Sequence, residues 1–421
     1  MAATSRTYRS IRGALSAACA LAGVGGVATS RATEVETAIL GYTEPNRVSA
    51  LETVLQARHD FGSGRLANFK VVYDVLTGAS ASGAVPGAAV QTFTRPSGRG
   101  SYTTAPGETP LDNTFRDARV AVSGGATLPL GRLSTVSAGL YGSGEHDYTS
   151  LGANASVSRD FDRHNRTLSA SLSFSRDTVT PEGGRPIPFA PMAAVGIDQP
   201  RLAGDGSKDV ADAMLGLVQV IDRATLVQVT YSLSRVTGYQ TDPYKLVSVV
   251  DPTSGAPVDQ LFENRPDART KHILFGRVKR QLPHGAVDLS YRFMTDDWGI
   301  ASHTIELRDR VALGGGGKYL QPHLRFYSQS AADFYARWLL DGAALPDHAT
   351  ADYRLGEFQA WTFGLEHGRD VGRDHRLTAR VEYYRQSGDG HPAGAPGDLA
   401  GFDLFPVVDA WIFQVGYSFG S

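Results

Sequence analysis

Two aspartates, a histidine and a glutamate within one expected hairpin are residues whose types could bind a metal ion. Asp296 and Asp297 end one expected strand, and His303 and Glu306 follow shortly after. Carboxylate oxygens are ligands for Ca²⁺, and an added imidazole suits other divalent ions. The alternative is that the aspartates cap a tight extracellular turn while Trp298 lies at the membrane interface. We favour the turn, keep the four residues as metal candidates, and expect no cofactor.

The sequence contains no recognisable motif for hydrolytic catalysis. Serine and histidine are plentiful, but Gly-x-Ser-x-Gly, His-Glu-x-x-His and paired cysteines are absent. His303, His323 and His367 fall on different expected strands. The glycines of 314–317 are not followed by the Lys-Ser/Thr pair and helix of a phosphate-binding loop. The protein is therefore not expected to be an enzyme, and an outer-membrane hydrolase ranks behind the two hypotheses given below.

A charged segment begins one expected external loop. Asp242-Pro243-Tyr244-Lys245 combines a proline, which fixes φ, with an aspartate that can accept hydrogen bonds from the turn backbone. Loop architecture is the simpler interpretation. The alternative is a loop folded into the pore as a constriction, where Lys245 and Arg265 would face acidic groups.

The elements that position these residues are predicted to be β-strands. The segment Thr167 to Ser175 alternates threonine and serine with apolar Leu168, Ala170, Leu172 and Phe174. A helix would scatter these residues over several faces. The same alternation recurs in 51–61, 66–77, 118–128, 151–161, 226–239, 287–295, 320–329, 359–367 and 377–386. Since no later apolar run approaches the ~20 residues of a spanning helix, strands must carry any membrane crossing.

The connections between these strands alternate in length. Tight connections are expected at 62–64, 129–131, 162–165, 222–223, 283–285 and 314–317. Long polar segments rich in glycine and proline occupy 78–114, 177–209, 241–268, 330–353 and 387–409. With a first strand near 33–42 and a last one from Trp411, the sequence predicts an all-β fold, a transmembrane antiparallel β-barrel of about 16 strands. Its short turns would be periplasmic and its long loops extracellular; a soluble β-sandwich, the alternative, gives no reason for this asymmetry.

Charged residues of both signs occupy the expected lumen face of several strands. The candidates for pore lining are Glu52, Arg58, Lys70, Asp74, Asp117, Arg119, Asp288, Arg292, Arg325, Arg380 and Glu382. In a water-filled barrel, such residues would tune which solutes pass. The alternative is a neutralised ladder that stiffens the barrel wall. Mixed signs argue against strong selectivity for either anions or cations.

The N-terminus has the composition of a secretory signal peptide. Arginines precede a short run of small apolar residues. Cleavage after Ala28 or after Ala32 would satisfy the small-residue rule, so we expect a signal peptide within 1–32 and a barrel over 33–421. Either cut removes Cys19, the only cysteine, and the serine three positions before it argues against lipidation.

The C-terminal segment adds an independent membrane signal. From Trp411 to Phe419, large apolar residues occupy every second position. This pattern resembles the terminal strand read by the barrel-assembly machinery, although Gly420 and Ser421 follow the final aromatic. We expect outer-membrane lipid and that machinery as partners. A net charge of −2 without basic blocks gives no reason to expect nucleic acid as a partner.

Several segments in order resemble the family known as domain of unknown function 3570. They are 238–245, 263–270, 291–293 with 296–300 and 302–304, 325–330 with 332–335, and 76–80 with 91–94. The resemblance covers nearly the whole chain after the signal peptide. It implies an outer-membrane barrel of Gram-negative bacteria and leaves the activity open.

Two functional hypotheses follow from this architecture. The first is a passive, porin-like channel for small hydrophilic solutes, because sixteen strands leave a water-filled interior. The second is a scaffold whose long loops hold another protein of an envelope or redox system. Only a few residues are expected between the signal peptide and the first strand, which argues against the plug of an energised TonB-type transporter.

Overall fold

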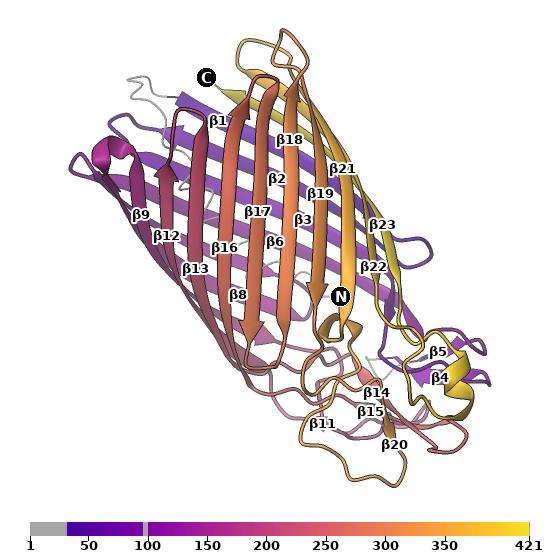
Figure 1. Ribbon diagram of the computed structural model, residues 1–421. Helices are drawn as coiled ribbons and strands as arrows, with labels where there is room; N and C mark the ends of the chain where they lie inside the picture. The colour runs from indigo at the N-terminus through magenta and orange to yellow at the C-terminus, as the bar shows by residue number, and fades with distance from the viewer. Residues whose placement is uncertain (1–31, 96–99, 421) are drawn as a thin grey trace.

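Sixteen strands of the computed structural model form one closed antiparallel barrel (Figure 1). The structure describes residues 32–95 and 100–420. In barrel order the strands are β1 (Ala32–Thr43), β2 (Val48–Asp60), β3 (Leu66–Ala81), β6 (Leu111–Leu130), β7 (Ser134–Gly144), β8 (Tyr148–Phe161), β9 (Arg166–Val179), β12 (Gly206–Val220), β13 (Thr225–Gly238), β16 (Ala268–Leu282), β17 (Gly285–Asp296), β18 (Ala301–Ala312), β19 (Tyr319–Gln329), β21 (Phe358–Asp370), β22 (His375–Ser387) and β23 (Val408–Gly420). β1 and β23 close the ring, with Thr43 opposite Trp411. The predicted fold is confirmed.

The predicted signal peptide lies outside the described residues, apart from Ala32, which begins β1. Cys19 lies outside them as well. Within 32–95 and 100–420, no helix is long and apolar enough to cross a membrane.

Period-two alternation gives the barrel an apolar outer surface. On β9, Leu172 and Phe174 are 67% and 53% exposed, whereas the hydroxyl of Ser173 between them donates to Asp212 of β12 on the inner face. Leu151 of β8 is 70% exposed in the same way. Because every barrel strand is paired on both sides, no strand edge faces the lipid. This is the surface of a membrane-spanning barrel of the outer-membrane type.

The two ends of the barrel differ in the length of their connections. At the end where β1 begins and β23 ends, all connections are short: 61–65, 131–133, 162–165, 221–224, 283–284, 313–318 and 371–374. At the other end, the long connections are 82–110, 180–205, 239–267, 330–357 and 388–407. This asymmetry matches the sequence prediction. The departure is that 44–47, 145–147 and 297–300, which are also short, lie at the long-loop end.

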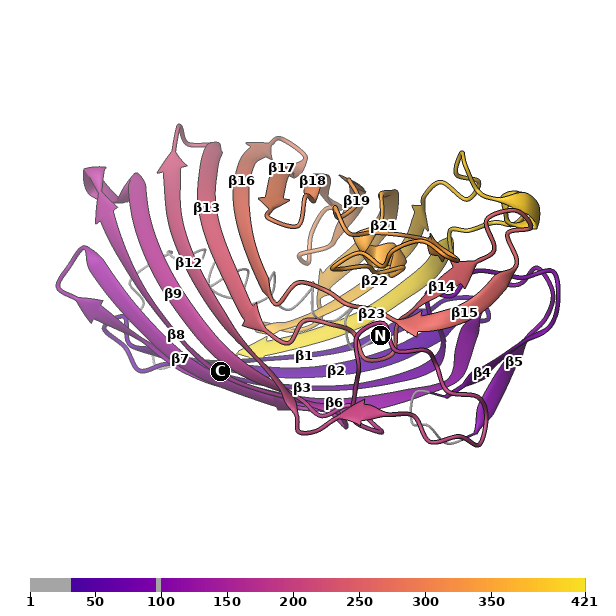
Figure 2. The same cartoon turned by 90° about the horizontal axis from the view of Figure 1, so that it is seen from below.

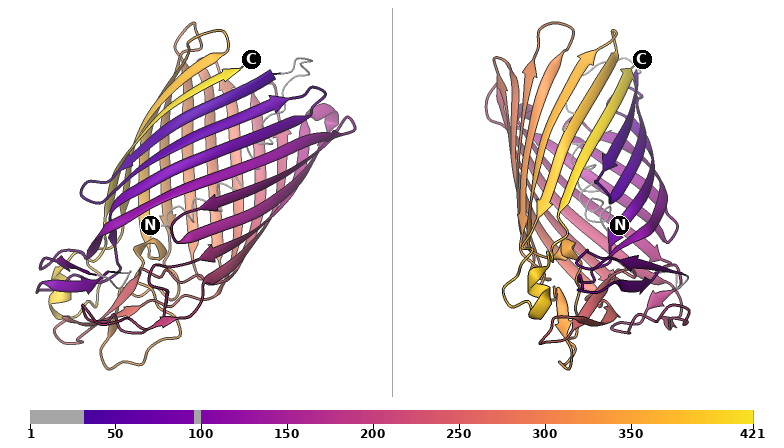
Figure 3. Two further views of the ribbon diagram at one scale, coloured as in Figure 1. Left: turned by 180° about the vertical axis from the view of Figure 1, so that it is seen from behind. Right: turned by 90° about the vertical axis from the view of Figure 1, so that its right-hand side faces the viewer.

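The long connections fold into small structures of their own, which together we call the loop cap. Figures 1 and 3 show them gathered at one end of the barrel. Their elements are β4 (Gln91–Thr94), β5 (Ser101–Thr104), β10 (Arg185–Pro186), β11 (Arg201–Leu202), β14 (Leu246–Val250), β15 (Pro257–Phe262), β20 (Trp338–Leu340), η2 (Tyr353–Leu355) and η3 (Gly397–Gly401). A further short helix, η1 (Asp162–His164), lies in a turn at the opposite end.

The loop cap has its own hydrophobic core, which explains how connections of this length hold one shape. β14 pairs with β15 antiparallel and with β20 parallel, so it joins two loops into one sheet. Phe93 of β4, Tyr102 of β5 and Phe262 of β15 pack together. Val250 and Leu399 form a second cluster that includes the last loop. The cap is therefore a folded layer across several loops rather than a set of independent loops.

Viewed from the cap end, the strands form a ring (Figure 2). β16 to β19 form one side, and β2, β3 and β6 lie opposite them across the ring, an arrangement also visible in Figure 1. Lumen-facing side chains from these two walls point toward one interior.

Candidate functional site

Six charged side chains are buried together in the loop cap, and we call them the cap charge cluster. They are Asp242, Lys245, Glu263, Arg265, Asp352 and Arg354. The side chains of Glu263, Asp352 and Lys245 retain only 0%, 1% and 3% exposure. Burying charges is costly unless each is paired and hydrogen-bonded, so the contacts within this cluster decide whether the cap is stable.

Asp352 lies at the centre of the cluster and binds both arginines. Its Oδ2 accepts from Arg265 Nη2 at 2.8 Å, and its Oδ1 accepts from Arg354 Nε at 2.7 Å. Arg354 Nη2 also donates to Asp242 Oδ2 at 3.0 Å. These contacts join the 239–267 loop to the 330–357 loop through fork-shaped guanidinium groups, which match carboxylates well.

Glu263 completes the network on its other side. Its Oε1 lies 2.6 Å from Arg265 Nε and accepts from the backbone amide of Asp242, also at 2.6 Å. Its Oε2 accepts from the hydroxyl of Thr350. Lys245 Nζ donates to the carbonyl of Ala81, the last residue of β3, and so ties the cluster to the barrel wall. Each carboxylate therefore has a basic or hydroxyl partner.

The pKa values in the cluster follow from burial and from these partners. Burial opposes ionisation of Asp352, but Arg354 and Arg265 outweigh it and hold the pKa of this carboxyl far below its usual range. The pKa of Asp242 is lowered in the same way, mainly by Arg354 against the effect of burial. Burial raises the pKa of Glu263 and lowers that of Lys245. Three acids face three bases, so the cluster is a neutral cross-link with no free charge to offer a solute.

Sequence reasoning found half of this cluster and missed the other half. It singled out Lys245 and Arg265 as bases that would face acidic groups if their loop folded inward, and the structure places both beside carboxylates inside the cap. It gave no role to Asp352 or Arg354. Asp352 lies 87 residues along the chain from Arg265, and Arg354 lies 112 residues from Asp242. Only the Asx-type capping of η2 by Asp352 marks the segment locally.

The strand register places the predicted pore-lining residues on the lumen face. These are Glu52, Arg58, Lys70, Asp74, Asp117, Arg119, Asp288, Arg292, Arg325, Arg380 and Glu382. Several of them pair with one another. Arg119 Nε donates to Asp74 Oδ2 at 2.6 Å, and its Nη2 lies 3.9 Å from Glu52 Oε2. This arrangement spans β2, β3 and β6, so the charges on this wall largely neutralise each other.

A second paired group lies on the wall formed by β18, β19, β21 and β22. The imidazole of His323 lies between two carboxylates, with Nδ1 2.8 Å from Glu382 Oε1 and Nε2 3.3 Å from Glu306 Oε1. Arg308 Nη2 also contacts Glu306 at 2.6 Å, and Arg380 Nε lies 3.7 Å from Glu382. On β16 and β17, Arg277 Nε likewise donates to Asp288 at 2.7 Å.

The proposed metal ligands do not come together. Asp296 accepts from Arg269 Nε at 2.8 Å and from the amides of Trp298 and Ile300, so its oxygens serve the turn. Asp297 accepts from the amide of Thr270 at 2.8 Å. His303 and Glu306 lie on opposite faces of β18, because the odd-numbered residues of this strand point outward. Among the residues that the structure describes, no group of three or more possible ligands is close enough to hold a metal ion.

The three histidines considered for catalysis are also separated. His303 lies on the outer face, where its Nδ1 is 2.7 Å from the hydroxyl of Tyr291. His323 lies in the lumen between two carboxylates. His367 has its Nδ1 2.9 Å from the carbonyl of Tyr319. Because these three histidines lie in different parts of the barrel, they cannot act together on one nucleophile.

The wall formed by β8 and β9 is lined by hydroxyl groups instead of charges. Ser156 faces Ser171 and Ser158 faces Ser169 across this pair. The hydroxyls of Thr135 and Ser158 lie 2.6 Å apart, which extends the pattern to β7. Short hydroxyl side chains leave room in the lumen and can hydrogen-bond water or solutes. The lumen therefore has a serine-rich wall beside its charged walls.

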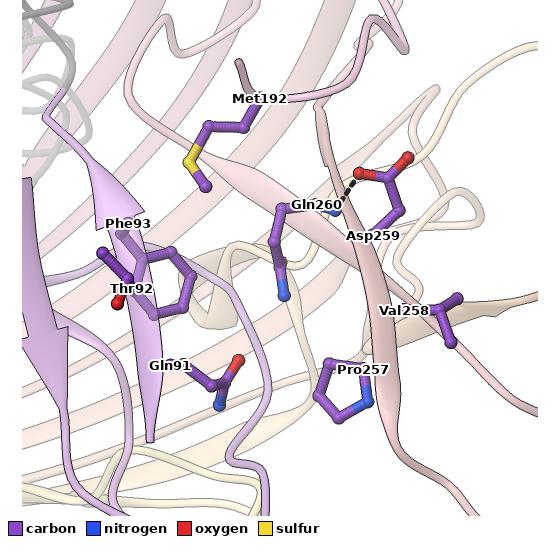
Figure 4. A pocket seen from close by; sticks show the side chains of 8 residues that line it. All are labelled: Gln91, Thr92, Phe93, Met192, Pro257, Val258, Asp259 and Gln260. Carbon is purple, nitrogen blue, oxygen red and sulfur yellow. Dashed lines mark hydrogen bonds between the residues drawn. The ribbon is translucent and has the colours of Figure 1, made fainter. Parts of the chain in front are cut away.

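The loop cap also contains a small open pocket (Figure 4). Its volume is about 260 Å³, and it is lined by Gln91, Thr92, Phe93, Met192, Pro257, Val258, Asp259 and Gln260. The figure shows residues of β4, β15 and the 180–205 loop around one space. The backbone amide of Met192 donates to the carbonyl of Gln260 at 2.7 Å, which fixes one side of the pocket. The residues that line the pocket include no basic side chain.

Several solved bacterial proteins have a partly similar chain path. The siderophore receptor PirA from Acinetobacter baumannii has a TM-score of 0.41 at 10% identity, with 86% of this chain and 54% of that chain covered. The outer membrane protein opdK from Pseudomonas aeruginosa has a TM-score of 0.40 at 8% identity, covering 93% and 99%. CdiB from Acinetobacter baumannii has a TM-score of 0.46 at 8% identity, covering 92% and 60%. This chain thus spans little more than half of the PirA chain.

Sequence comparison gives a family. No curated protein matches the chain. The sequence model of a family described as a protein of unknown function (DUF3570) matches residues 13–419. That match includes the barrel strands, the loop cap and the segments on which the sequence resemblance rests. The chain therefore belongs to the DUF3570 family.

Proposed function

We propose that the protein is a passive outer-membrane channel for small hydrophilic solutes. The observation that supports this most is the polar lining of a closed sixteen-strand barrel. Its lumen faces carry hydroxyls on β8 and β9, and charged side chains on two walls, one formed by β2, β3 and β6 and the other by β16 to β19, β21 and β22. Barrels of this size have a water-filled interior. A polar lining is compatible with that water, whereas an apolar lining would favour packing of the lumen.

In this proposal the loop cap narrows the entrance. The cap is cross-linked by the buried Asp352 pairs and anchored on β3 through Lys245, so the loops keep a fixed shape at the barrel mouth. A fixed entrance excludes large solutes by size and leaves the choice among small ones to the lumen. No movement of the cap is needed for passive flow.

The test is conductance of the purified, refolded barrel in planar lipid bilayers. A heat-modifiability gel on the same sample establishes that the protein is folded. We expect stable, ohmic current steps. A folded protein that produces no steps over repeated insertions would overturn the channel proposal.

We further infer that the chain is exported and inserted in the outer membrane of a Gram-negative cell. The apolar exterior and the alternating aromatic C-terminal strand β23 support this address. N-terminal sequencing of protein recovered from an outer-membrane fraction should begin at residue 29 or 33. A chain recovered with its first residues intact in the inner membrane would contradict both inferences.

A scaffold that binds an envelope protein is the second candidate, and the folded loop cap is the observation in its favour. Loops with a shared sheet and core present a fixed surface to a partner. In that case a protein should co-purify in stoichiometric amount after mild detergent extraction. It should be lost when the cap is disordered by Asp352→Ala, and the barrel should be electrically silent.

A further inference from the structure

Three basic side chains near the cap end of the lumen face form no ion pair. They are Lys271 of β16, Arg292 of β17 and Arg325 of β19. Among the described residues, no carboxylate oxygen lies within ion-pair distance of any of them. All three are partly exposed, and their strand positions direct that exposure to the interior. Arg119, by contrast, forms an ion pair with Asp74.

The acidic residues beside these bases are already bound to other partners. Asp296, opposite Lys271 in the register, pairs with Arg269 and accepts two turn amides. Glu306, opposite Arg325, is held by Arg308 and His323. Within 32–95 and 100–420, none of the three bases is therefore in direct contact with a carboxylate.

Arg292 and Arg325 lie close to each other on the barrel wall, and Lys271 lies nearer the cap. Arg292 is opposite Thr304 of β18, and Thr304 is opposite Tyr327 of β19. Arg325 lies two residues before Tyr327 on the same face, with its guanidinium 5.5 Å from that ring. One strand separates β17 from β19, so their backbones are about 10 Å apart and two arginine side chains can reach one solute. Lys271 lies on the neighbouring strand β16, opposite Asp296 and thus four residue positions nearer the cap than Arg292.

Apolar and aromatic side chains share this part of the lumen. Phe275 is opposite Arg292, and Met294 is opposite Ile273, on the inner face. Tyr327 adds an aromatic surface beside Arg325. A cation row next to apolar surface suits a small organic anion, because arginine binds a carboxylate or phosphate group while the carbon skeleton contacts the rings.

We propose that Lys271, Arg292 and Arg325 form an anion-binding row that makes the channel select small anions carrying a carboxylate or phosphate group. This inference rests on the proposed channel function. It revises the expectation from mixed lumen charges, because the acids are consumed by other bases while these three bases are not. The row lies near the cap end of the strands, where an entering solute meets it first.

Reversal potentials under a potassium chloride gradient test the selectivity. The wild-type channel should favour chloride, and Arg292→Gln and Arg325→Gln should each lower the chloride-to-potassium permeability ratio by about fivefold. Arg280→Gln is the matched control, because Arg280 lies on β16 but on the outer face near the opposite end. A wild-type channel that prefers potassium, or equal effects of Arg280→Gln and Arg292→Gln, would overturn the proposal.

Binding separates failure of the row from failure of the channel. Folded protein in detergent is titrated with inorganic phosphate and, separately, with benzoate, and heat is measured. Wild type and Arg280→Gln should bind, whereas the double variant Arg292→Gln, Arg325→Gln should lose binding by at least tenfold. Binding without conductance would refute the channel and retain the row. Conductance without anion preference or row-dependent binding would refute the row and retain the channel.

Discussion

Replacing Asp352 by alanine should disorder the loop cap while leaving the barrel folded. Asp352 is 1% exposed and is the shared partner of Arg265 and Arg354. Its removal leaves two buried guanidinium groups with fewer acidic partners, and it also removes the side chain that caps η2. The barrel strands keep all their own pairings, because no ladder hydrogen bond involves this residue.

The expected magnitude follows from the type of interaction that is lost. Breaking a buried ion pair by removing one partner costs about 3–5 kcal/mol. Loss of the helix cap adds about 1 kcal/mol. Because the cap is one layer with its own core, this cost falls on the local opening of the cap and raises its open population by roughly two orders of magnitude or more.

Hydrogen exchange measured by mass spectrometry on the folded barrel is the assay. Peptides from 239–267 and 330–357 should exchange much faster in Asp352→Ala, while peptides from β8 and β9 should not change. Asp347→Ala is the matched control, because Asp347 is an exposed acid in the same loop. Asp352→Asn, which keeps a capping oxygen, should show an intermediate effect. Unchanged protection in Asp352→Ala, or loss of heat modifiability, would refute the reasoning.

Three further predictions follow from the same structure. Because the pKa of Asp352 is depressed, its stabilisation of the cap is complete above the usual aspartate pKa of about 4 and is lost as the pH falls below it; the protection factors of cap amides, which are the intrinsic exchange rates at each pH divided by the measured ones, should be constant from about pH 7 to 5 and fall below about pH 4. Leu172→Arg, on the lipid face, should lower the free energy of unfolding in lipid vesicles by about 2–4 kcal/mol in a urea titration, whereas Ser171→Arg, on the lumen face, should lower it much less. Gly238→Ala should reduce the refolding yield on heat-modifiability gels, because its φ is +106° and a Cβ would lie 2.3 Å from a backbone oxygen of β12; Gly276→Ala, with nothing within 4 Å, should refold normally.

Most of the barrel could be predicted from the sequence because its signals are local. A strand between lipid and lumen must alternate apolar with polar residues, whatever its neighbouring strands are. A segment such as Thr167 to Ser175 can therefore be recognised as a strand from its own residues. The long loops also identify themselves by glycine, proline and polar content. The short connection 297–300 at the cap end did not fit the simple rule, since loop length on one side is a tendency and not a physical requirement.

The pairing of charges required the tertiary structure. The four metal candidates looked like one site because they are close in sequence, but alternation sends His303 outward and Glu306 inward, and the turn amides use Asp296. Arg292 and Arg119 looked equivalent as charged lumen positions. Only the register shows that Arg119 has an acidic neighbour while the acid nearest Arg325 is taken by other bases.

By itself the sequence determined that this chain is a sixteen-strand barrel with a long-loop end, because side-chain period and turn composition act within a few residues. The tertiary structure decided how the loops close over that end, since Arg265 and Asp352 meet across 87 residues of chain. It also decided which lumen charges remain unmatched. Such contacts depend on which strands are neighbours and on their register, and no local pattern encodes the distance between two charges far apart in the chain.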